Sequence, residues 1–181
     1  NYFDEFRDRG EVDGERVRSL YVGFSAEKFK VSKETDDDLP SFSLVLEEKV
    51  SLLDDYLSDQ PAQEANEDGT PRHKWKTVKT KLSDINTSKL HFVRVPDRHI
   101  VIDFDLKNQS GQTSLERNLE AASLWPPTYA ELSRSKKGVH LHYEYDGVPS
   151  DLSPIYSEGI EIKVYTGDSS LRRMVTRCNS I

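Results

Sequence analysis

The stretch that most constrains the fold of this chain is 99–106, in which apolar and polar residues alternate. Successive side chains of a β-strand point to opposite faces, so the alternation predicts a strand with one apolar face packed on a core. Asp103 and Asp105 share the opposite face, about 7 Å apart along the strand. Carboxylates at that spacing suit one or two divalent cations, which prefer hard oxygen ligands. The alternative is a half-solvated strand with an acidic outer face.

A second alternating stretch follows Lys136 and Lys137 and places His140 and His142 on the face opposite its apolar residues. The intervening Gly138 allows a close approach of the backbone. Lysines, a glycine and a histidine at the mouth of a strand can hold a triphosphate through charge and backbone N–H groups. A structural role is the alternative for either histidine.

The third alternating stretch is 159–165, where Glu161 and Lys163 lie opposite a face of isoleucine and valine. These two side chains can form an ordinary cross-strand charge pair. However, three strands of the same design supply two aspartates, two histidines and a Glu/Lys pair on their polar faces. Stacked in one sheet, they would form a single metal-and-phosphate site.

The rest of the chain predicts a mixture of short helices and strands. The expected elements are a strand near 17–24, an amphipathic helix within 43–59, a flexible loop at 60–72, a strand at 89–95 that forms an antiparallel hairpin with the 99–106 strand, and a helix that starts at the capping box 113–116 and ends before Pro126. The hairpin is predicted from the turn residues Pro96, Asp97 and Arg98, and the helix from Thr/Glu capping-box spacing.

Residues 73–82 carry four lysines around Trp75. A solvated helix face is the favoured interpretation of this segment, and a nucleic-acid contact is the alternative.

The formal net charge of −7 conceals an asymmetry between the two parts of the chain. Residues 1–73 have 19 acidic and 9 basic residues, a net charge of −10, whereas 74–181 have 13 and 16, a net charge of +3. This excludes a wholly basic nucleic-acid binder but leaves a mildly basic C-terminal part. No apolar run approaches the ~20 residues of a membrane span, and no signal peptide is expected. The single Cys178 rules out an internal disulfide and a multi-cysteine zinc site, and favours a reducing compartment.

In chain order, 101–105 (Val-Ile-Asp-Phe-Asp), 138–140 (Gly-Val-His) and 160–161 (Ile-Glu) resemble the three motifs of the archaeo-eukaryotic primase superfamily. Those motifs are a hydrophobic-Asp-hydrophobic-Asp strand, a small-x-His strand and a hydrophobic-acid strand. The stretch 166–173 is similar to the phage and mobile-element primase-polymerases. The resemblance covers about residues 74–181, and Glu161 departs from the aspartate of many members, although glutamate also ligates magnesium.

The resemblance implies an α+β fold with an RRM-like, largely antiparallel sheet and flanking helices. It places the catalytic core in 74–181 and leaves 1–73 as an acidic N-terminal α/β part. The implied activity is template-directed nucleotidyl transfer in DNA replication by two-metal catalysis with Mg²⁺ or Mn²⁺. Its expected partners are a DNA template, nucleoside triphosphates and a replicative helicase in the same or another chain, with no membrane. The expected location is the cytoplasm, that of the host cell if the chain is phage-encoded.

The site residues that the resemblance implies fall into two sets. The catalytic and metal-binding set is Asp103, Asp105 and Glu161. The nucleotide-binding set is Lys136, Lys137, His140, Lys163, Arg172 and Arg173.

Three other classes of protein compete with this interpretation. A PD-(D/E)xK nuclease would use Glu161 and Lys163, with Asp103 or Asp105 completing the metal site, but gives His140 no role. A nucleotide-sugar glycosyltransferase also uses Asp-x-Asp with manganese, yet does not predict the two later strands. The non-enzyme alternative is an inactive nucleic-acid-binding domain. The sequence lacks a G-x-x-x-x-G-K-[ST] loop, so any helicase activity would lie outside it.

Overall fold

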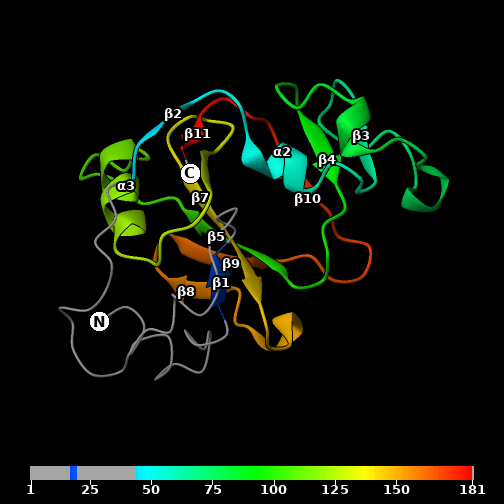
Figure 1. The fold of residues 1–181 in the computed structure, drawn as a ribbon. Coiled ribbons are helices and arrows are strands. Elements are labelled where there is room, and N and C mark those ends of the chain that lie inside the picture. The colour runs from blue at the N-terminus through cyan, green and yellow to red at the C-terminus, as the bar shows by residue number, and fades with distance from the viewer. Residues whose placement is uncertain (1–16, 20–43, 181) are drawn as a thin grey trace.

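The computed structural model describes residues 17–19 and 44–180 and shows two sheets with few helices (Figure 1). Every strand pairing in those residues is antiparallel, so the predicted α+β class is confirmed at this coarse level. No helix in the described part of the chain is long and apolar enough to cross a membrane.

The larger sheet contains eight strands and the smaller one three. In spatial order the larger sheet is β2 (Leu46–Glu48), β11 (Cys178–Asn179), β6 (Ala130–Leu132), β7 (Val139–Tyr145), β5 (His99–Phe104), β9 (Ile160–Val164) and β8 (Ile155–Ser157), with β1 (Val17–Ser19) paired to β7. The smaller sheet is β10 (Leu171–Arg173), β4 (His91–Val93) and β3 (Ala62–Glu64). The helices are α2 (Leu52–Tyr56) and α3 (Leu115–Ser123), and 3₁₀ turns occur at Trp75–Thr77, Leu82–Asp84 and Pro149–Asp151.

Strand β5 lies inside the larger sheet, between β7 and β9, so the three alternating stretches belong to one sheet as predicted. In its register, Asp103 is directly opposite His140 on β7 and Glu161 on β9. Directly paired residues project to the same face of a sheet, so these three side chains share one face.

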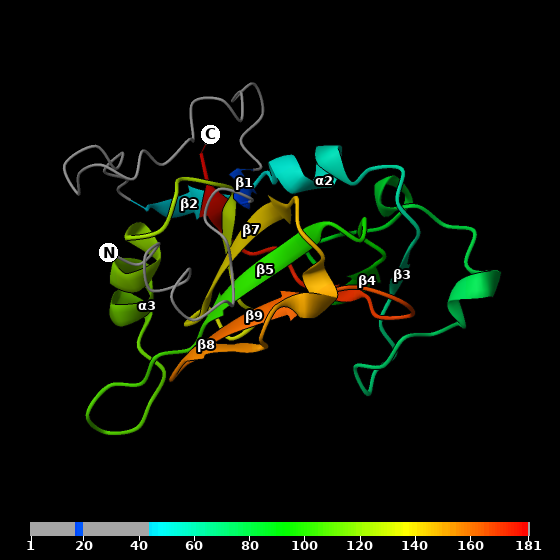
Figure 2. The ribbon, with the colours of Figure 1, turned by 90° about the horizontal axis from the view of Figure 1, so that it is seen from below.

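A hydrophobic core lies on each face of the larger sheet, whose strands β7, β5, β9 and β8 lie side by side in Figure 2. On one face α3 packs against β5 and β7, and Ile102 and Phe104 belong to this core with Trp125. On the other face Val101 packs in a second core with residues of α2 and the smaller sheet, such as Leu53 and Val93. Strand β5 is therefore buried on both faces, and the half-solvated alternative is wrong except around Asp103.

The predicted hairpin between 89–95 and β5 is wrong. A turn does form, because the His99 amide donates to the Pro96 carbonyl at 2.9 Å, but it connects two different sheets. Strand β4 pairs with β3 and β10 instead. All three residues of β4 are buried, and both of its edges are taken, so no edge remains for β5.

The predicted helix within 43–59 is also largely wrong, because only α2 is helical. Ser51 begins this helix as its N-cap, with its Oγ accepting from the Leu53 amide at 3.1 Å. Leu46 lies in β2 opposite Asn179, and Val50 is 80% exposed. The helical spacing of leucines thus arises from a strand, a turn and a single short helix.

Other boundaries differ by smaller amounts. Helix α3 is capped by Ser114, whose Oγ accepts from the Arg117 amide, one residue later than the predicted capping box, and it ends before Pro126 as expected. The predicted loop 60–72 contains β3. Strand β1 covers 17–19, and the rest of the predicted 17–24 strand lies outside the described residues.

The described part of 1–73 shares both sheets with the later chain, because β2 pairs with β11 and β3 pairs with β4. The lysine-rich segment 73–82 is not a helix; it holds 3₁₀ turns in an otherwise irregular backbone.

Candidate active site

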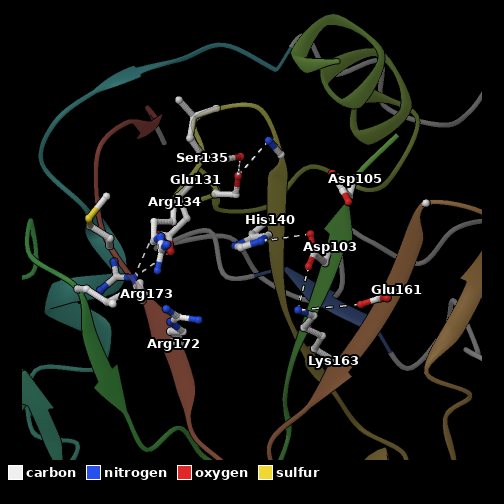
Figure 3. Close-up of a pocket in the computed structure, with 16 residues that line it drawn as sticks. Asp103, Asp105, Glu131, Arg134, Ser135, His140, Glu161, Lys163, Arg172 and Arg173 are labelled. Atoms are coloured by element: carbon white, nitrogen blue, oxygen red, sulfur yellow. Dashed lines mark hydrogen bonds and ion pairs between the residues drawn. The ribbon is translucent and has the colours of Figure 1, made fainter. Parts of the chain in front are cut away.

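Four polar residues form a row across adjacent strands of the larger sheet. Glu131 on β6 pairs with His140, His140 pairs with Asp103, and Asp103 pairs with Glu161. All four line a cavity of about 530 Å³ between this sheet and β10. Figure 3 shows His140, Asp103, Lys163 and Glu161 joined side by side in the cavity. Sheet register alone therefore brings three of the predicted site residues together.

Asp103 is the centre of this row. Its Oδ1 lies 3.2 Å from His140 Nε2, and its Oδ2 lies 3.0 Å from Lys163 Nζ. Burial by itself would raise the pKa of Asp103, but the hydrogen bond and charge of His140 and the Lys163 ammonium outweigh it and lower the pKa to about 2. Asp103 is therefore an ionised carboxylate at any physiological pH.

Glu161 and Asp105 differ in how they relate to Asp103. Glu161 Oε2 lies 4.0 Å from Lys163 Nζ, so the two acidic residues flank one ammonium group. Asp105 follows the end of β5 and turns to a loop, where it accepts from Thr113 Oγ1 at 2.8 Å and from Lys107 Nζ at 3.2 Å. Asp105 still lines the cavity, but its carboxylate is engaged outside the row.

The donor set of the row fits a hard divalent cation. Asp103 and Glu161 offer carboxylate oxygens from neighbouring strands at the same height, and Mg²⁺ is bound in proteins by one or two carboxylates together with substrate phosphates. Within the described residues, no group of three or more His, Cys, Asp or Glu side chains is arranged to hold a metal ion. Lys163 Nζ lies between the carboxylates of Asp103 and Glu161, and Asp105 is bonded to Thr113 and Lys107.

The turn between β6 and β7 forms the rim of the cavity. Ser133, Arg134 and Ser135 line the cavity, and the Gly138 amide donates to Ser133 Oγ at 2.9 Å. A Cβ at Gly138 would lie 2.8 Å from that oxygen and 3.1 Å from a backbone carbonyl of β5, so glycine is required there. This close approach is what the sequence predicts for that position.

Lys136 and Lys137 lie on the same turn but do not line the cavity. Both are exposed, and Lys136 has a positive φ of 63°. The cationic group that the turn brings to the cavity is Arg134 instead.

The two predicted arginines on β10 have different environments. Arg172 is exposed and lines the cavity. Arg173 also borders the cavity, but its side chain is only 1% exposed and pairs with Glu131 at 2.9 Å. Alternation along the strand accounts for the difference, since neighbouring residues face opposite sides.

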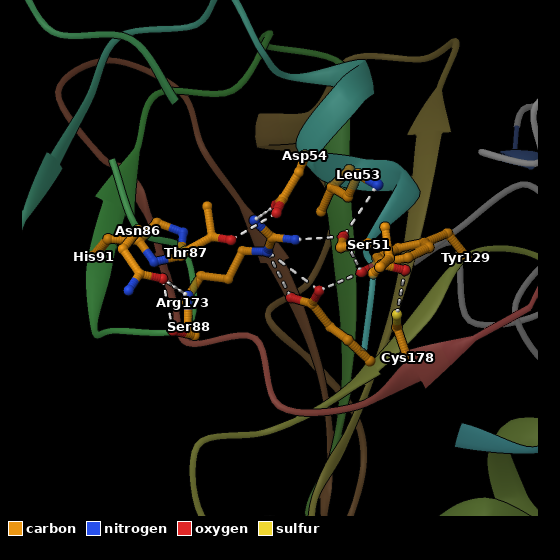
Figure 4. A network of polar contacts seen from close by, with 12 residues as sticks. Ser51, Leu53, Asp54, Asn86, Thr87, Ser88, His91, Tyr129, Arg173 and Cys178 are labelled. Carbon is orange, nitrogen blue, oxygen red and sulfur yellow. Dashed lines mark hydrogen bonds and ion pairs between the residues drawn. The ribbon is translucent and has the colours of Figure 1, made fainter. Parts of the chain in front are cut away.

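Arg173 belongs to a buried polar network between the two sheets, which Figure 4 shows. Besides Glu131, its guanidinium donates to Asp54 Oδ1 at 2.6 Å and to Ser51 Oγ at 2.7 Å, both at the start of α2. Tyr129 donates to Glu131 at 2.6 Å. Burial would raise the pKa of Glu131, but the charge of Arg173 outweighs it and holds that pKa well below its usual range.

The same network extends to two buried histidines. His142 Nε2 lies 3.5 Å from Glu131 Oε1, and its Nδ1 is 2.9 Å from His99 Nε2. Both rings are fully enclosed, so His142 has the structural role and His140 the position in the candidate site.

His91 is buried as well, and the three buried histidines are expected to make the protein less stable in mild acid. Burial lowers the pKa of His91 and His142, and burial together with the charge of His142 lowers that of His99 well below its usual value. As the pH falls below about 6.5 the unfolded chain binds protons that the folded chain excludes, so stability is lost progressively as the pH falls toward 5.5. Urea denaturation between pH 7.5 and 5.5 measures this. The control variant His73→Gln, at an exposed position, should lose stability with falling pH as steeply as the unmodified chain does. A free energy of unfolding that does not change over this pH range would contradict the burial of the three histidines in their neutral form.

Sequence reasoning missed Glu131, Ser133 and Arg134. Strand β6 has only three residues, too short for alternation to be visible. A signal did exist in the rim turn, where the Ser-Arg-Ser-Lys-Lys-Gly stretch places three cations and two hydroxyls just before the second motif.

Comparison of the chain with protein-family models, with curated proteins and with solved structures found no match in any of the three.

Proposed function

We propose that this chain is a nucleotidyltransferase that joins nucleotides under the direction of a DNA template, as a DNA primase, a DNA polymerase or both. The observation that carries the proposal is the row in which Asp103 lies between His140 and Glu161 on adjacent strands, inside a cavity with a cationic rim. Asp103, His140 and Glu161 come from the three stretches that resemble the primase motifs, and their direct pairing supports the proposal.

Asp103 and Glu161 are the residues that would hold Mg²⁺ or Mn²⁺. Bound metal ions would supply activation of a 3′-hydroxyl and stabilisation of the leaving pyrophosphate in an in-line displacement. Asp105 could join them only by leaving Thr113 and Lys107, which is feasible because its side chain is 57% exposed.

The rest of the cavity supports binding of a triphosphate. His140 and the rim residues Ser133, Ser135 and Arg134 offer hydrogen-bond donors and positive charge on the β7 side. Arg172 adds a cation on the side of the smaller sheet. No protein nucleophile is needed for phosphoryl transfer, because positioning and electrostatic stabilisation supply most of the catalysis.

The finer expectations of the resemblance belong to the same proposal. They are an RRM-like arrangement for the strands around β5, a cytoplasmic location, and a helicase as a further partner. Lys136 and Lys137, exposed on the rim turn, would reach phosphates beyond the cavity.

A metal-dependent nuclease is the second candidate, and one observation favours it. Lys163 Nζ lies 3.0 Å from Asp103 and 4.0 Å from Glu161, so an acid, a second acid and a lysine meet on two paired strands. In that interpretation Lys163 would position an attacking water. His140, 3.2 Å from Asp103, would have no assigned role.

Two variants separate these candidates. His140→Ala removes a charge-assisted phosphate contact worth about 1.5–3 kcal/mol, so nucleotide incorporation should become one to two decades less efficient while metal binding is retained. A nuclease would instead cleave DNA without added nucleotide, lose that activity in Lys163→Ala and retain it in His140→Ala. Both variants are to be measured in both assays, and cleavage without any extension would reject the proposed function.

A further inference from the structure

A second feature of the molecule, away from the cavity, is an unusual concentration of positive charge. Residues 72–81 contain Arg72 and four lysines but no acidic residue, in a chain of net charge −7. The lysines of this segment are Lys74, Lys76, Lys79 and Lys81, and all are exposed. We call residues 72–81 the basic loop.

The basic loop is held in place at both ends along the free edge of β3. Isolated bridges join Ala65 to Pro71 and Pro61 to Lys81. Residues 72–80 therefore form a loop that leaves the β3 edge at one bridge and returns to it at the other. The buried side chain of Gln63 donates to the His73 carbonyl at 3.0 Å and accepts from the His73 amide at 2.7 Å. The backbone is therefore anchored while the side chains of Lys74, Lys76 and Lys79 are exposed to solvent, and Lys81 pairs with Asp59 at 3.4 Å.

An aromatic residue lies among these cations. Trp75 is only partly buried, and the Arg94 guanidinium carbon lies 5.8 Å from the centre of its ring. Arg94 also donates to the Gly167 carbonyl in the loop that leads into β10. Strand β10 carries Arg172, which lines the cavity. Cationic and aromatic groups thus extend from the basic loop, through Arg94, toward the candidate active site.

We propose that the basic loop binds single-stranded nucleic acid, with its lysines on the phosphates and Trp75 against a base. A positively charged track combined with an exposed aromatic ring is how proteins bind single strands without sequence preference. Lysines alone would serve a duplex or an acidic protein equally well. Trp75 favours a single strand because only unstacked bases can lie on an aromatic ring.

This inference rests on the proposed function only in naming the template as the natural ligand. Binding itself needs neither metal nor nucleotide, so it can be tested separately from catalysis. The loop on the β3 edge of the smaller sheet lies at the opposite end of the molecule from α3 (Figures 1 and 2), and no residue of 72–81 lines the cavity that holds the row around Asp103.

The experiment is fluorescence anisotropy of a labelled 20-nucleotide oligo(dT) with the full chain, over a series of salt concentrations and without metal. Lys76→Gln/Lys79→Gln should weaken binding and reduce the slope of log K against log salt by about 1.4, since each phosphate contact contributes about 0.7. Trp75→Leu should weaken binding about tenfold with the slope unchanged, and Trp75→Tyr should restore most of it.

The matched control is Lys49→Gln/Arg177→Gln, which removes the same charge from two exposed residues beside β2 and β11. It should bind as the unmodified chain does. The inference is overturned if oligo(dT) does not bind, or if the basic-loop variants bind it as the control does. It is also overturned if a duplex of the same length binds as tightly as oligo(dT) and Trp75→Leu weakens neither complex. Asp103→Asn should bind oligo(dT) normally. An unmodified chain that binds oligo(dT) but extends no primer would count against the proposed function alone.

Discussion

Replacing Asp103 with asparagine is expected to lower the rate of template-directed nucleotide incorporation by at least about a thousandfold. Asp103 is the carboxylate at the centre of the row, ionised and held between His140 and Lys163. A metal ligand contributes several kilocalories per mole of transition-state stabilisation, and an amide cannot replace its charge. Primer extension with a labelled nucleotide in Mn²⁺ measures the change.

The same variant should remain folded, which separates loss of chemistry from loss of structure. The folded-state pKa of Asp103, about 2, lies below that of an unfolded aspartate, so its charge contributes about 2 kcal/mol above pH 4, and this is lost as the pH falls toward 2. Asparagine should therefore lower the free energy of unfolding by about that amount at pH 7. The control is Asp151→Asn, at an exposed residue of a 3₁₀ turn. It should change neither the rate of nucleotide incorporation nor the free energy of unfolding. Extension by Asp103→Asn at an undiminished rate would remove the site from consideration.

Replacing Arg173 with leucine is expected to lower the free energy of unfolding by about 3–5 kcal/mol. The change leaves Glu131, only 2% exposed, as a buried carboxylate without its cation, and breaking a buried ion pair from one side has costs of this size. It also removes the link from β10 to Ser51 and Asp54 at the start of α2. Chemical denaturation measures the loss.

The neighbouring residue supplies the control. Arg172 is exposed, so Arg172→Leu should change stability by less than about 1 kcal/mol while weakening nucleotide binding. The double variant Glu131→Leu/Arg173→Leu should lose less free energy of unfolding than its two single variants lose together, because no unpaired buried charge remains in it. Equal effects of the two arginine substitutions on stability would contradict the assignment of Arg173 to the network.

The part of the fold that sequence predicts well is the part with strict alternation. The stretches around Asp103, His140 and Glu161 are strands of one sheet, and their polar residues share one face because the side-chain period of a strand is two. The same period separates Arg172 from Arg173, but three residues of strand do not show which of the two faces inward.

The parts of the fold that could not be predicted from the sequence depend on contacts between residues far apart in the chain. A turn at Pro96 is consistent both with a hairpin and with a passage from one sheet to another. The pairing of both edges of β4, with β3 and with β10, decides between them. The leucines of 43–59 match helical spacing although Leu46 is in a strand. Glu131 was missed because its role depends on Arg173, 42 residues away in the chain.

The most direct test of the central claim is which nucleotide is added to a primer on four templates that differ in one base. With Mn²⁺ and all four nucleoside triphosphates, each template should direct addition of its complementary nucleotide, and Asp103→Asn should add none. Addition that ignores the template base, or cleavage of the DNA with no addition on any template, would contradict template-directed nucleotidyl transfer at Asp103.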